Sequence, residues 1–158
     1  MCLERATNLP KKKTGIGYKV FCVDSVSNII PEFAGNKPIP VGEWVKEQDR
    51  RPGLFDNGHS RCSGKVNGDY ITPSYSTVSS YPLGFHILRY KKHALHYAKS
   101  KHGYPGSSVA IHKVQYRKVC YAGTIKETVH HEPVPTVACK IVVAKEMKVL
   151  ERIVSILA

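Results

Sequence analysis

Apolar and polar side chains alternate along residues 17–23, and this period of two predicts a β-strand. Lys19 and Phe21 fall on one face of this strand, and Val20 falls on the other. Because both faces carry apolar side chains, we expect an inner strand that packs on both sides. Glycines just before the strand and Asp24 just after it mark its ends.

A second strand is predicted over Gly84–Leu88, where a turn at Pro82 leads into an apolar run. Residues 89–101 then predict an α-helix, because apolar positions recur at intervals of three and four along one face. Gly103 would end this helix. The side chains that we expect on its solvent side are Lys92, His93, His96 and Lys99.

Three further apolar stretches predict strands at Val109–Tyr116, Val119–Ala122 and Val137–Val143. From Lys145 onward the apolar side chains recur at helical intervals, so we expect a second helix at the end of the chain. Its apolar positions are Met147, Leu150, Ile153, Val154 and Leu157.

Prolines and glycines interrupt residues 28–70, which we expect to be mostly loop. Within this region, Pro40–Val45 is a candidate short strand that holds the only tryptophan, Trp44. Asn67-Gly68 lies between two short apolar stretches and predicts a hairpin turn, because both residues tolerate positive φ.

These elements favour a compact α+β fold with two helices and a mixed or mainly antiparallel sheet. With 158 residues, the chain is long enough for one hydrophobic core and short for two. We therefore expect residues 1–15 to form a basic N-terminal arm. Residues 16–158 would form a single domain with a loop-rich insertion at about 28–70.

No apolar run approaches the roughly 20 residues of a membrane span, so we expect a cytoplasmic protein without a membrane partner. If the protein is viral, this would be the host cytoplasm. The five cysteines are widely spaced without a CxxC pair, which is typical of reduced thiols and not of a disulfide framework. We also expect a homo-oligomer.

The net charge of +12 is concentrated in one part of the chain. Residues 70–126 contain no carboxylate side chain, but they carry nine Lys or Arg and five of the eight histidines. A field of one sign captures anions, so this segment indicates a phosphate-bearing partner.

Tyrosines interleave with the basic residues of this segment, which suits base stacking combined with phosphate neutralisation. Our first hypothesis is a pocket for an anionic nucleotide-type ligand. Its expected residues are Lys19, His86, Arg89, His112, Lys113 and Tyr116. The alternative is non-specific binding of DNA or RNA on an outer basic face. That face would use Lys92, Lys99, Lys101, Arg117 and Lys118.

Sequestration of the ligand needs only binding, so the chain does not have to be an enzyme. If it is a phosphodiesterase or lyase, His86 or His112 would act as general acid or base. Cys2 is a third candidate, because removal of Met1 would place its thiol beside its own α-amino group.

No metal or cofactor is expected. The His93/His96 pair, the adjacent His130-His131 and the His59/Cys62 pair lack the supporting ligands of a zinc site. The glycines near residue 15 lack the third glycine and the following helix of a dinucleotide fingerprint.

Three segments resemble a diffuse group of small uncharacterised bacteriophage and bacterial proteins. They are Met1-Cys2-Leu3, Gly17-Tyr18-Lys19-Val20 and Gly84-Phe85-His86 followed by the helix. This resemblance implies a viral accessory protein and carries no established catalytic residues. By analogy, such a protein would counter host nucleotide immune signalling.

A fainter resemblance is to ADP-ribosyltransferases. Tyr75-Ser76-Thr77 is similar to their serine-threonine strand motif, and Glu127 would be the corresponding acid. Tyr18-Lys19 stands where that family has an arginine or histidine, and the usual acidic pair is absent. This similarity implies a further alternative, an ADP-ribosyltransferase-like enzyme.

Overall fold

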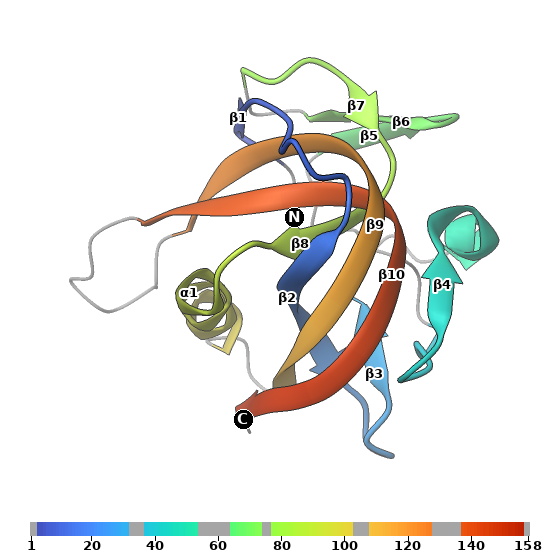
Figure 1. Cartoon of the computed structure of the whole chain (residues 1–158). Helices are drawn as coiled ribbons and strands as arrows, with labels where there is room; N and C mark the ends of the chain where they lie inside the picture. Colours follow the sequence, from blue (N-terminus) through green and yellow to red (C-terminus); the bar gives the residue numbers. More distant parts are fainter. Residues whose placement is uncertain are drawn as a thin grey trace.

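Two long antiparallel strands dominate the computed structural model, which describes residues 3–31, 37–53, 64–73, 77–102, 108–127 and 137–156. They are β9 (Ser108–Glu127) and β10 (Val137–Ile156), each of 20 residues. The two strands pair from Glu127↔Val137 to Val109↔Ile156 and bend together through the molecule (Figure 1).

Two shorter strands close the sheet on itself. β2 (Gly15–Val23) pairs with the first half of β9, and β8 (Phe85–Leu88) pairs with β10. β2 and β8 then meet through the pair Tyr18↔Leu88. The pairings therefore form a ring in the order β2, β9, β10, β8 and back to β2.

The remaining short elements attach to this ring. β1 (Arg5–Ala6) pairs with β9, β3 (Ile29–Pro31) pairs with β2, and β4 (Trp44–Lys46) pairs with β10. A 3-10 helix, η1 (Glu47–Gly53), follows β4 directly.

A second small sheet consists of β5 (Gly64–Asn67), β6 (Tyr70–Pro73) and β7 (Tyr81–Pro82). The turn between β5 and β6 places Gly68 at φ 58°, a left-handed conformation that suits glycine. All of the ladders in both sheets are antiparallel.

Hydrophobic clusters lie on both faces of the curved sheet. The first cluster includes the buried side of the helix α1 (Lys91–His102), with Ala94 and Tyr97 fully buried. Val20 of β2 belongs to this cluster, whereas the next residue, Phe21, belongs to the second. The strand therefore packs on both faces, as its sequence pattern predicts.

Irregular pairing between β9 and β10 creates a bulge. Val119 lies opposite Ala144 and Tyr121 lies opposite Val143, so Cys120 is the extra residue on β9. Close to this bulge, Lys118 adopts φ 58°. A residue with a side chain adopts this left-handed conformation at a cost of about 1–2 kcal/mol.

Several predicted elements are confirmed with adjusted ends. They are the strand at residues 17–23, the strand after Gly84, the helix from residue 89, the hairpin at Asn67-Gly68 and the short strand at Trp44. The described residues form mostly antiparallel sheet with one α-helix and one 3-10 helix, so the fold is mainly β and consistent with the predicted α+β class. The strands predicted at residues 109–116 and 119–122 are parts of the single strand β9.

The prediction of a second helix at the end of the chain is wrong, because residues 145–156 continue the strand β10. Two register shifts between Val149 and Val154 interrupt the alternation of this strand, and they give its apolar positions helix-like spacing. The β-branched side chains of this segment favour a strand, and pairing with β9 satisfies its backbone.

Part of the predicted N-terminal arm packs on the ring. Leu3 is fully buried, the Glu4 amide donates to Thr124 O at 2.9 Å, and the Thr7 amide donates to Ala122 O at 3.0 Å. None of the helices in the described ranges is long and apolar enough to cross a membrane.

We expect Gly17→Ala to destabilise the protein at the junction of β2 and β8. A Cβ atom at Gly17 would lie 2.9 Å from Leu88 O and 2.5 Å from Ile87 Cγ2, so the two strands would have to separate. The expected loss is about 1–3 kcal/mol of unfolding free energy, measured by urea unfolding. Ile16→Ala is the control, because the neighbouring Ile16 is exposed. Equal stability of the two variants would contradict this role of Gly17.

Candidate functional site

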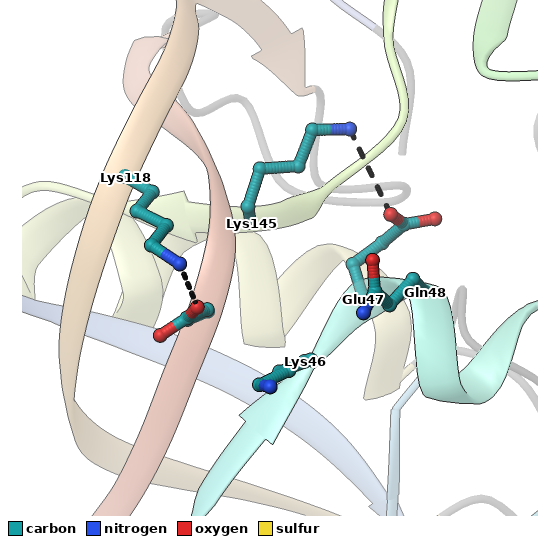
Figure 2. Close-up of a pocket in the computed structure, with 6 residues that line it drawn as sticks. Lys46, Glu47, Gln48, Lys118 and Lys145 are labelled. Atoms are coloured by element: carbon teal, nitrogen blue, oxygen red, sulfur yellow. Dashed lines mark hydrogen bonds and ion pairs between the residues drawn. The ribbon is translucent and has the colours of Figure 1, made fainter.

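A cleft of about 310 Å³ lies where β4 and η1 face the bulged part of β9 and β10. The lining side chains come from all four elements and are almost all charged. They are Lys46, Glu47, Gln48, Lys118, Lys145 and Glu146. Figure 2 shows two ion pairs in the cleft, with Lys46 below them in this view.

Glu146 is the most deeply buried acid of the cleft, with 3% of its surface exposed. One carboxylate oxygen accepts from Lys118 Nζ and the other accepts from Arg117 Nε. These two hydrogen bonds hold the pKa of Glu146 below its ordinary value. Glu146 therefore stays ionised and fixes two cations on one side of the cleft.

Glu47 holds the other side. It is buried at the start of η1, and one of its carboxylate oxygens lies 3.7 Å from Lys145 Nζ. Lys145 also donates to Leu83 O. Lys46 is exposed, and it makes no hydrogen bond or ion pair with any residue that the structure describes. Its amine is available to a ligand.

Trp44 stiffens the β4 wall of the cleft. The Arg117 guanidinium lies 4.0 Å from the centre of the Trp44 ring, and Lys148 Nζ lies 5.8 Å from it. Because Arg117 also bonds to Glu146, a cation–π contact and an ion pair join β4 to both long strands.

The backbone of Lys118 is strained at this point, and strained residues concentrate at functional sites. Its side chain is 66% exposed although it pairs with Glu146. Lys118 lies beside the bulged Cys120, whose pKa is raised by burial, while the charge of Lys145 lowers it in part. This raised pKa keeps the Cys120 thiol protonated and poorly nucleophilic.

His86, a predicted catalytic residue, lies in the interior. It is 1% exposed, and its Nε2 lies 2.9 Å from the hydroxyl oxygen of Tyr81, which also accepts from the Leu3 amide at 3.3 Å. Burial lowers the pKa of His86 well below its ordinary value, and the nearby charge of Lys19 acts in the same direction. Burial raises the pKa of Tyr81 to about 12. Both groups are therefore neutral near pH 7.

Lys19 and His86, both predicted for the ligand pocket, are in contact, because the side chain of Lys19 bonds to the backbone of His86. Lys19 is 4% exposed, and its amine donates to His86 O at 2.9 Å. This carbonyl lies two residues before Leu88, at which β8 pairs with Tyr18 of β2. The ammonium group thus satisfies a strand carbonyl near the ring closure.

His112 packs in the second hydrophobic cluster, in edge contact with Phe21 at 5.6 Å between ring centres. Its Nδ1 lies 3.1 Å from Leu150 O, and Arg152 Nε donates to its Nε2 at 3.5 Å. Burial lowers the pKa of His112. A neutral ring satisfies both hydrogen bonds, with Nδ1 as donor and Nε2 as acceptor.

The structure brings some of the predicted pocket residues close together. Lys19 lies directly opposite His112 in the ladder of β2 and β9. Burial raises the pKa of Tyr116, and the nearby charge of Arg89 partly offsets this shift. Lys113 pairs with the exposed Glu151 at 3.2 Å, and Tyr116 is buried against Gly15 and Gly17. Arg89 is exposed before α1 and lies over the Tyr90 ring. His86 and His112 contact different hydrophobic clusters.

The predicted outer basic face is divided between two places. Lys92 and Lys99 are exposed on α1, whereas Arg117 and Lys118 are at the cleft. His93, which we expected in solvent, is buried, and its Nδ1 accepts from the Lys140 amide at 3.0 Å. A histidine in the first turn of α1 can reach the backbone of β10, and this contact overrides the helical pattern.

Sequence reasoning missed five cleft residues, which are Lys46, Glu47, Gln48, Lys145 and Glu146. The first three lie in the region expected to be loop, and the other two lie in the segment expected to be helix. The single tryptophan, Trp44, lies two residues before Lys46. It was the available signal that this region packs against the rest of the protein.

Other predicted residues lie outside the described ranges. They are Cys2, His59, Cys62, Tyr75, Ser76, His130 and His131, together with the side chains of Lys101 and Glu127. Among the described residues, no three His, Cys, Asp or Glu side chains are grouped as metal ligands would be. Comparisons of the chain with protein-family models, with curated proteins and with solved structures gave no match.

We expect stability to fall as the pH is lowered from 7.5 to 5. His86, His93 and His112 all have lowered pKa values in the folded state. The unfolded chain therefore binds more protons, and each histidine can cost about 1.4 kcal/mol per pH unit below its unfolded pKa of about 6.5. Urea unfolding across this range measures the slope.

The variant His112→Gln should make this pH dependence shallower, because it removes one of the three groups. A pH-independent unfolding free energy in the wild-type protein would show that these histidines can be protonated without unfolding.

Proposed function

We propose that the protein binds an anionic nucleotide-type ligand in the cleft between β4–η1 and β9–β10. The observation that carries this proposal is the gathering of three lysine amines around one hollow, with Lys46 unpaired among the described residues. Two of these lysines have carboxylate partners, so their amines are held in place before a ligand arrives.

The size and walls of the cleft support a small ligand. A volume of about 310 Å³ is at the lower end of the range for small-molecule sites, so it suits one nucleotide-sized group. Three ammonium groups face two carboxylates, which leaves an excess of positive charge for a phosphate. The carboxylates and Gln48 can accept hydrogen bonds from donors on a base or a sugar.

Binding without chemistry is the form of this function that the site supports best. The histidines that could act as acid or base are buried, and their ring contacts lie in the hydrophobic clusters. A binder suits the sequestration of a nucleotide signal. That is the role expected by analogy for a viral accessory protein.

We expect Lys46→Ala to weaken binding of AMP by about tenfold or more, because it removes an amine that the ligand would contact. Lys118→Glu should abolish binding by reversing the charge at the strained position. Isothermal titration calorimetry at constant salt measures both affinities. Lys46 has no protein partner among the described residues, so its removal should change stability by less than about 0.5 kcal/mol.

Lys92→Ala is the matched control, since Lys92 is an exposed lysine on α1, outside the cleft. If Lys46→Ala and Lys92→Ala weaken AMP binding equally, the ligand responds to overall charge and the cleft is not its site.

The dependence on salt separates this function from non-specific binding of DNA or RNA. A cleft ligand should keep most of its affinity between 50 and 200 mM salt, because few charges are neutralised, whereas a polymer that contacts 6–10 phosphates loses about 10³–10⁵. A thermal-shift screen should include AMP, cyclic dinucleotides, ADP-ribose, single-stranded DNA and RNA. Stabilisation by the polymers alone would overturn the cleft proposal in favour of the nucleic-acid alternative.

A further inference from the structure

The basic run Lys11-Lys12-Lys13 lies next to the cleft, although it is more than 100 residues from Lys118 in the chain. The Val119 amide donates to Lys13 O at 3.2 Å, so the run is anchored on β9 directly after Lys118. The charge of Lys13 also acts on the Cys120 thiol, together with the charges of the cleft residues Lys145 and Glu47. These contacts place the arm beside the cleft.

All three side chains of the run are exposed, and none forms an ion pair with a residue in the described ranges. No carboxylate in the part of the chain that the structure describes neutralises them in the way that Glu146 neutralises Arg117 and Lys118. The run is therefore a source of cations that the described residues leave without an acidic partner.

The order across the sheet is the arm at Lys13, β9 at Lys118, β10 at Lys145 and β4 at Lys46. Neighbouring strands lie about 4.8 Å apart, so these four segments extend the row of cations over about 14 Å. A single phosphate group cannot contact both ends of such a row.

We propose that the ligand carries more than one phosphate group, with a nucleotide in the cleft and further phosphates along Lys11–Lys13. This inference rests on the proposed function of the cleft and adds the chemical class of the ligand. Two classes share this chemistry. One is a nucleoside polyphosphate, with consecutive phosphates, and the other is a short oligonucleotide, with phosphates separated by sugars.

The test compares AMP, ATP and the dinucleotide pApA as probes in isothermal titration calorimetry at one salt concentration. The triple variant K11S/K12S/K13S removes the three amines but keeps the Lys13 carbonyl that anchors the arm. The matched control is K91S/K92S/K99S, which removes three exposed lysines from α1. In Figure 1, α1 lies on the other side of β9 and β10 from β4.

We expect the arm variant to lower the affinity for ATP or pApA by about tenfold and to keep the affinity for AMP within about twofold, because only the longer probes extend beyond the cleft. The probe that loses more affinity identifies the chemical class of the ligand. The α1 variant should leave all three affinities nearly unchanged, and unchanged melting temperatures will confirm that both variants fold.

Two results would overturn this inference while the cleft function stands. In the first, the arm variant binds ATP and pApA as tightly as the wild-type protein. In the second, the arm variant loses as much affinity for AMP as for the longer probes. Both results keep the cleft function if Lys46→Ala still weakens AMP. A wild-type protein that binds none of the three probes overturns the cleft function together with this inference.

Discussion

The antiparallel ladder between β9 and β10 is the constraint on which the rest of the structure depends. β1 and β2 pair with β9, whereas β8 and β4 pair with β10, so the ladder sets the positions of all four strands. Its curvature brings β2 and β8 close enough to meet at Tyr18↔Leu88. Without this curvature the sheet would remain open, and its two faces could not enclose two hydrophobic clusters.

The bulge at Cys120 links this architecture to the cleft. An extra residue on β9 changes which side chains point to each face, and it increases the local twist. Here it coincides with left-handed Lys118 and with a buried acid, Glu146, on the facing strand. Burying a carboxylate is costly unless charged partners compensate it, and Arg117 and Lys118 provide that compensation. The charges of the cleft are thus tied to the pairing of the long strands.

Local patterns predicted the inner strand, the helix and the hairpin, because each depends on neighbours within a few residues. Two features of the cleft could be recognised only from the three-dimensional fold. Register shifts hid the strand period of residues 145–156, so Lys145 and Glu146 could not be assigned to a sheet face. The grouping of Lys46 with Lys118 depends on β4 pairing with β10, a contact between residues about 100 positions apart. The sequence therefore indicated Arg117 and Lys118 as basic residues but not Glu146, the acid that pairs with both.

The number of basic residues in the acid-free stretch of residues 70–126 overestimates the positive electrostatic field that a ligand would meet at the surface. Its cations Arg117 and Lys118 are compensated by Glu146, and Lys113 pairs with Glu151, both from a strand outside the stretch. Charge counted along the sequence is therefore a poor guide to charge at the surface. Among the described residues, the cations at or beside the cleft that have no such partner are Lys46 and the Lys11–Lys13 run, and all of them come from other parts of the chain. These lysines define where an anion would gain most, because no carboxylate in the described ranges has to be displaced to reach them.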